Sequence, residues 1–162
     1  MKLELIQPFI NAADAVLTQT LDCGTQLEKL TMEDEAYRRH GIAAEIRIAG
    51  DVEGRVILDL DADMVASIAD SLAGGESLDR HALAYETICE VANQVIGNAV
   101  TELNDRGFRF RIHPPLVHTS ERGLSAGEDT EALLMSIVTC RGRAYLSILL
   151  HYASGSEPAR AD

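Results

Sequence analysis

Residues 82–107 are expected to form one long helix whose polar side chains are spaced for chemistry. At about 100° per residue, the polar positions fall within one narrow arc. They are Glu86, Glu90, Asn93, Gly97, Thr101 and Asn104, and the opposite side is apolar. A carboxylate can pair with a cation, and the asparagine amide one turn further on can fix a water by donating and accepting hydrogen bonds. Glu90 and Asn93 therefore suit a surface that enters another molecule's active site and orients a hydrolytic water.

Gly97 adds a second indication on the same face. Glycine inside a helix costs roughly 1 kcal/mol relative to alanine, so Gly97 calls for a reason such as the close approach of another backbone. The structural alternative is a solvated helix face on which the glycine is incidental. We name Glu90 and Asn93 as candidate catalytic residues, and Glu86 and Gly97 as candidate partner-binding residues.

The chain lacks the usual signatures of an independent catalytic centre. It contains no G-x-x-x-x-G-K-S/T, no G-x-G-x-x-G after a strand and no G-x-S-x-G. Its five histidines are scattered without metal-binding spacing. Asp59, Asp61 and Asp63 alternate as in a calcium loop but lack the glycine and the distal glutamate, so helix capping is the better interpretation. We predict no metal site.

Composition narrows the class of protein. A chain of 162 residues with 46% hydrophobic content fits one domain, assigned to residues 1–152, with 153–162 as a disordered tail. The net charge of −12 argues against nucleic-acid binding. No apolar run approaches the roughly 20 residues of a membrane span, and the first residues lack signal-peptide features. Cys23, Cys89 and Cys140 are far apart, which favours reduced, buried thiols in a cytoplasm.

The hydrophobic pattern predicts an α+β domain with an antiparallel six-stranded sheet covered on one face by long helices. Helices are expected at 4–22, 62–73 and 82–107, the second capped by Asp61 or Asp63 and ended by Gly74. Strands are expected at 25–31, 42–48 and 55–60, with a turn at 50–54. Residues 108–113 and 116–119 are extended around Pro114 and Pro115, 120–130 form a mobile loop, and 131–140 and 143–151 form a closing hairpin.

The segment Glu90-Val91-Ala92-Asn93-Gln94-Val95-Ile96-Gly97 resembles the E-x-x-N-x-x-x-G signature of the CheC/CheX/FliY chemotaxis phosphatases. The opening residues 6–12, the helix that ends at Gly74 and Gly75, and the closing hairpin are similar too. The length and the single signature indicate the CheX branch. One departure is Glu86, where the family has aspartate or serine, and this difference could alter docking or the choice of partner.

The resemblance implies a function. Such proteins accelerate hydrolysis of the aspartyl phosphate of a CheY-like response-regulator receiver. The asparagine, here Asn93, orients the attacking water, and the glutamate, here Glu90, pairs with the receiver's lysine. The receiver supplies the Mg²⁺, so the resemblance implies no cofactor of the chain's own. It also implies a homodimer in which two sheets join, which would give the apolar closing hairpin a protected edge.

Two other interpretations stay open. The same helix could dock on a receiver without catalysis, as an adaptor in two-component signalling. The receiver would then bind without faster dephosphorylation. More remotely, the chain could be a structural subunit whose stripe forms an assembly interface, and its complex would be insensitive to phosphorylation.

Overall fold

The computed structural model describes residues 3–33, 37–74, 79–118 and 131–154. In chain order its elements are α1 (Leu3–Leu21), β1 (Thr25–Glu33), β2 (Ile42–Gly50), β3 (Val52–Leu60), α2 (Ala62–Ala73), α3 (Arg80–Asp105), β4 (Phe110–Ile112), β5 (Leu116–His118), β6 (Ala132–Thr139) and β7 (Gly142–Tyr152). The expected loop 120–130 and residues 155–162 of the expected tail lie outside the described residues.

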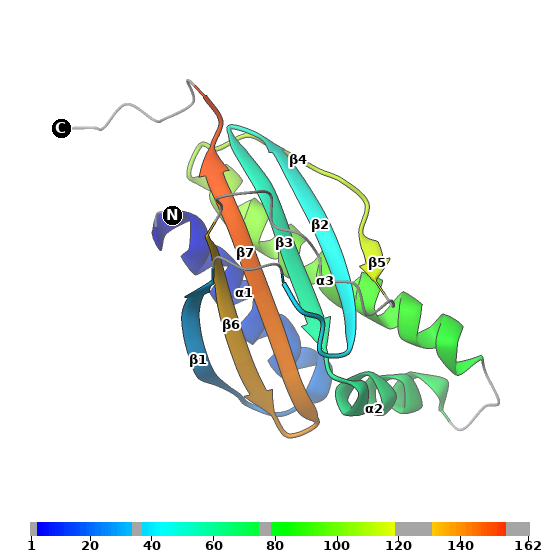
Figure 1. Ribbon diagram of the computed structural model, residues 1–162. Coiled ribbons are helices and arrows are strands. Elements are labelled where there is room, and N and C mark those ends of the chain that lie inside the picture. The colour runs from blue at the N-terminus through cyan, green and yellow to red at the C-terminus, as the bar shows by residue number, and fades with distance from the viewer. Residues whose placement is uncertain (1–2, 34–36, 75–78, 119–130, 155–162) are drawn as a thin grey trace.

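The described strands form one antiparallel sheet of seven strands in the order β1-β6-β7-β3-β2-β4, with β5 also paired to β2. Figure 1 shows α1 and α3 on one face of this sheet and α2 near one end. The predicted α+β class and the helices on one face are confirmed. The strand count is seven instead of six because β4 and β5 are separate short strands. Pro114 and Pro115 lie between them and cannot donate to a ladder.

The core lies between the helices and the sheet. Along α1, the buried residues recur at helical spacing, through Leu5, Phe9, Ala13 and Leu17. They meet the apolar face of α3 and alternate residues of the central strands, including Val56, Leu58, Leu146 and Ile148. Because these apolar side chains are covered, the opposite face of α3 is fixed toward the outside of the domain.

The closing hairpin lies inside the sheet. β6 pairs with β1 on one side, and β7 pairs with β3 on the other. This position accounts for the near-continuous burial of both strands. The expectation that this hairpin supplies an edge for dimerisation is therefore wrong. Among the described strands, the two edges are β1 and the short strands β4 and β5. The long-range β1–β6 pairing left no local signal in the sequence.

The turn expected at residues 50–54 is tighter than predicted. β2 ends at Gly50 and β3 begins at Val52, so only Asp51 lies between the two strands. Gly54 is already within β3, with φ at 143°. A Cβ at this position would lie 1.9 Å from the Leu149 carbonyl oxygen of β7. The second glycine of the segment therefore serves close strand packing and not the turn.

Cys23 and Cys140 form a disulfide, which contradicts the prediction of reduced, buried thiols. The two residues are 117 positions apart, yet their Cα atoms lie 6.3 Å from each other. The cause is the β1–β6 ladder, which pairs Thr25 with Thr139. Cys23 lies shortly before Thr25 and Cys140 directly after Thr139, so this pairing brings the two cysteines together. Cys140 is exposed. The cysteines therefore do not indicate a reducing compartment.

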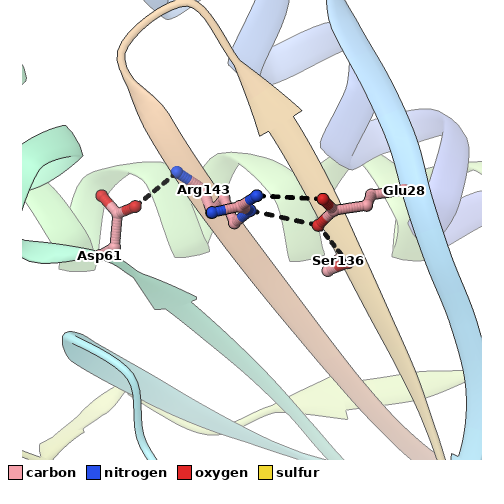
Figure 2. A network of polar contacts seen from close by, with 4 residues as sticks. All are labelled: Glu28, Asp61, Ser136 and Arg143. Carbon is pink, nitrogen blue, oxygen red and sulfur yellow. Dashed lines mark hydrogen bonds and ion pairs between the residues drawn. The ribbon is translucent and has the colours of Figure 1, made fainter.

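A polar network fixes the start of α2 on the sheet (Figure 2). Asp61 caps the helix by accepting from the Met64 amide at 2.8 Å, and its other carboxylate oxygen accepts from the Arg143 amide at 2.6 Å. The Arg143 guanidinium donates to Glu28 through Nε and Nη2, at 3.1 and 3.0 Å. Ser136 donates to the same carboxylate at 3.3 Å. One network thus ties α2 to β1, β6 and β7.

Candidate functional site

α3 exposes the predicted polar stripe to solvent; the stripe runs from Glu86 to Asn104 along one face of the helix. The helix begins after Asp79, whose carboxylate accepts from the His81 amide at 3.0 Å. Its apolar side is buried against α1 and the sheet, through Ile88, Val91, Ala92, Val95, Ile96, Ala99, Val100 and Leu103. With that side fixed in the core, helical geometry places the opposite residues in solvent.

The four predicted site residues share this outer face. Glu86, Glu90 and Asn93 are exposed, and Gly97 is partly exposed. Thr101 and Asn104 continue the exposed stripe toward the end of the helix. The structure therefore brings the predicted residues together on one accessible surface.

The two candidate catalytic side chains have different surroundings. Glu90 accepts a hydrogen bond from Gln94 Nε2 at 2.7 Å, which holds its carboxylate along the helix. Asn93 makes no side-chain hydrogen bond with any described residue. Its amide can therefore offer one acceptor oxygen and two N–H donors to a water or a partner. The Glu90 carboxylate is therefore held by Gln94, whereas the Asn93 amide makes no hydrogen bond with a described residue.

Gly97 has no packing reason within the described structure. A Cβ built at this position would meet no atom within 4 Å. Its carbonyl oxygen accepts from Thr101 Oγ1 at 2.8 Å, a contact that any residue would allow. Alanine would therefore fit and would favour the helix by about 1 kcal/mol, so the described fold does not require glycine there.

A pocket of about 200 Å³ opens beside Glu90. It lies between the end of α1, the middle of α2, one flank of α3 and the β6–β7 turn. Its apolar floor is formed by Leu21, Ile68 and Val91, and polar groups stand around it, among them Gln94 and Arg141. Glu90 thus belongs both to the exposed stripe and to the wall of this pocket.

The other sequence features have structural roles. Asp61 is the helix cap, and buried Asp59 accepts from the Tyr37 hydroxyl and from the His40 and Gly41 amides. Burial raises the pKa of the Cys89 thiol, which keeps it protonated at neutral pH. Among the described residues, no three His, Cys, Asp or Glu side chains are grouped so that they could hold a metal ion. None of the helices in these ranges has the length and apolar character to cross a membrane.

Residues 42–149 match the family model "Chemotaxis phosphatase CheX". The chain belongs to the CheX family. The matched span includes all of α3 and with it the Glu90–Gly97 signature, while α1 lies before it. The family predicted from the signature is therefore confirmed. No curated protein sequence matches the chain significantly.

Solved structures of CheX and CheC-like proteins share the fold. A CheC-like superfamily protein from Shewanella sp. PV-4 has a TM-score of 0.79 at 21% identity, covering 93% of this chain and 99% of that one. CheX from Vibrio vulnificus has a TM-score of 0.78 at 20% identity, covering 91% and 99%. A third structure is a complex of CheX with CheY, BeF3 and Mg²⁺ from Borrelia burgdorferi. It has a TM-score of 0.71 at 27% identity and covers 93% and 99%.

Two residues near this CheX-family signature were not predicted from the sequence. Gln94 is one turn after Glu90, and this spacing alone could have indicated the hydrogen bond between them. Arg141 lies 51 positions beyond Glu90, in the β6–β7 turn, and reaches the same pocket only through the tertiary fold. No local pattern could have identified it.

Proposed function

We propose that this CheX-family protein is a phosphatase that accelerates hydrolysis of the aspartyl phosphate on a CheY-like receiver. The observation that carries the proposal is the exposed pair on α3, in which Glu90 is held by Gln94 and the Asn93 amide is unengaged. The CheX–CheY complex from Borrelia burgdorferi shows a member of this fold bound to such a partner. We further propose that the protein acts in the cytoplasm.

Hydrolysis of the aspartyl phosphate would require only two side chains of this protein, those of Asn93 and Glu90. The Asn93 amide would hold a water in line with the phosphorus, so that the water oxygen attacks as the bond to the aspartyl oxygen breaks. Phosphate and a free carboxylate are the products. Glu90 would pair with a lysine of the receiver and fix the approach of α3, while the receiver supplies the phosphoryl group and Mg²⁺. Positioning and electrostatics dominate phosphoryl transfer, so no nucleophile of this chain is required.

The proposal is tested by phosphate release from a panel of acetyl-phosphate-labelled receivers, with and without the protein. At least one receiver should lose phosphate faster. Glu90→Ala should weaken both binding and rate, because it removes a charge-assisted contact. If receivers bind without faster release, the protein is an adaptor and the catalytic proposal is wrong.

We also propose a homodimer in which two sheets join through β1. This edge strand has nine residues, against three each in β4 and β5 at the other edge. Leu27, Leu30 and Met32 on β1 are 49%, 48% and 48% exposed, an apolar row that a second copy would cover. Light scattering should give a dimer mass that Leu30→Lys reduces to a monomer. A monomer mass for the unaltered protein at every concentration would refute the dimer.

A further inference from the structure

The pocket beside Glu90 is built to accept an apolar group. Its floor consists of Leu21, Ile68 and Val91, whose exposed fractions are 6%, 5% and 4%. These side chains come from three different helices, so the floor exists only in the folded domain. Its volume of about 200 Å³ exceeds the roughly 150 Å³ of an apolar cavity that binds benzene. One leucine or phenylalanine side chain would therefore fit.

Three polar side chains around the floor already donate hydrogen bonds within the chain. The Ser71 hydroxyl donates to the Ser67 carbonyl at 2.9 Å, and the Thr87 hydroxyl donates to the Leu83 carbonyl at 2.7 Å. Gln94 donates to Glu90 at 2.7 Å. An apolar group that covers these atoms would not leave their donors unpaired, so the usual desolvation penalty is small.

Arg141 places a positive charge at the rim of the pocket. Its Nη1 donates to the Ser67 hydroxyl at 3.0 Å, and no described carboxylate pairs with it. A guanidinium has five N–H donors, so most of its capacity is left for a partner. In a chain with a net charge of −12, such a cation gives an acidic partner a local point of attraction.

We infer that the pocket is a second contact point for the receiver. It takes one apolar side chain of the receiver, and a neighbouring carboxylate of the receiver pairs with Arg141. The inference rests on the proposed function. The position of the pocket identifies its occupant. Glu90 lines the pocket and also belongs to the exposed polar stripe of α3, so a receiver that binds over Glu90 and Asn93 covers the pocket mouth. An apolar side chain anchored in a pocket is a common source of binding energy at interfaces.

The test fills the pocket and leaves the stripe intact. Ser71→Trp places a large ring in the pocket from an exposed position on α2. Ala66→Trp, on the exposed surface of the same helix but outside the pocket lining, is the matched control. Affinity is measured by titration of the BeF3-treated receiver, and the rate by phosphate release at saturating receiver. Circular dichroism checks that both variants fold.

Ser71→Trp should raise the receiver Kd by about tenfold or more, the usual scale for loss of an anchor. Its rate at saturation should stay near that of the unaltered protein, because Asn93 is untouched. Ala66→Trp should change neither quantity. Arg141→Glu should also raise the Kd, and Arg141→Lys should restore part of the affinity, because only the charge is kept.

The outcomes separate the two proposals. If the unaltered protein accelerates dephosphorylation and Ser71→Trp binds the receiver equally well, the pocket inference is wrong and the proposed function stands. If Ser71→Trp instead changes only the mass in light scattering, the occupant is a second copy of this chain, and the inference is again wrong. If no receiver binds the unaltered protein, the proposed function fails and the inference fails with it.

Discussion

Glu90 and Asn93 lie one turn apart on α3, but their side chains have different surroundings. The hydrogen bond from Gln94 limits the rotamers of Glu90 before any partner arrives, whereas the Asn93 amide keeps its full hydrogen-bonding capacity. Such a division suits a site in which one residue recognises the partner and the other binds a reacting water. Both residues could be predicted from sequence because the period of a single helix is local information.

Gly97 offers a test in which stability and binding change in opposite directions. Gly97→Ala should raise the free energy of unfolding by up to about 1 kcal/mol, because alanine favours the helix and its Cβ meets nothing in the described fold. The added methyl should weaken receiver binding if the partner backbone approaches there. Denaturant unfolding and receiver titration measure the two effects.

Asn98→Ala is the matched control for Gly97→Ala. Asn98 is exposed on α3 but lies off the stripe, so its replacement should leave receiver affinity unchanged. If Gly97→Ala binds the receiver as well as the unaltered protein does, Gly97 has no role in docking.

At the scale of elements, α2 depends on contacts that are distant in sequence. The cap could be narrowed to Asp61 or Asp63 and the end predicted at Gly74, which has φ at 55°, because capping residues lie next to the helix that they end. The structure assigns the cap to Asp61. The bond from Arg143 to Asp61 and the ion pair of Arg143 with Glu28 could not be predicted. They exist because β1, β6 and β7 are neighbours, and strand order is not encoded in hydrophobic alternation.

This network predicts a pH effect. The hydrogen bond from Arg143, with its positive charge, lowers the pKa of Glu28 below the ordinary value of 4.5. A lowered pKa in the folded state stabilises the protein above the unfolded pKa and loses that contribution as the pH falls through the folded value. Glu28→Gln should therefore lower the urea midpoint at pH 7. The effect should be small, because the ion pair between Glu28 and Arg143 is exposed to solvent.

The difference in midpoint between Glu28→Gln and the unaltered protein should shrink when the pH falls below 4.5. The natural control is the same Glu28→Gln change made in an Arg143→Gln background, where Glu28 has already lost its guanidinium partner and its replacement should change the midpoint little at any pH. A difference that stays constant from neutral to acidic pH would show that the Glu28 carboxylate is not stabilised in the folded protein.

For the molecule as a whole, the sheet order explains what the sequence could not reveal. The helices, the β2–β3 hairpin and the β6–β7 hairpin are formed by neighbouring segments, and their patterns predicted them. The pairing of β1 with β6 joins residues 99 to 114 positions apart and decides two further features. It places the closing hairpin inside the sheet, and it brings Cys23 to Cys140.

The disulfide should stabilise the folded chain strongly. Its partners are 117 residues apart, and closing a loop of that length constrains the unfolded ensemble, with typical effects of about 2–5 kcal/mol. Reduction, or Cys140→Ser, should lower the Tm by roughly 5–15 °C. Thermal unfolding with and without a dithiol reductant measures this. Cys89→Ser keeps the Cys23–Cys140 bridge and should show the same sensitivity to the reductant. If the reductant does not change the Tm of the unaltered protein, the disulfide does not stabilise the fold.

In the proposed function, Asn93 does the chemistry from the exposed face of α3. The most direct test is single-turnover decay of a phosphorylated receiver in the presence of saturating protein, for the unaltered chain and for Asn93→Ala. The rate for the variant should be on the order of 100-fold lower, the scale of losing one preorganised hydrogen-bonding group at a reacting centre, and receiver affinity should be nearly unchanged. Equal rates for the two proteins would contradict this role of Asn93.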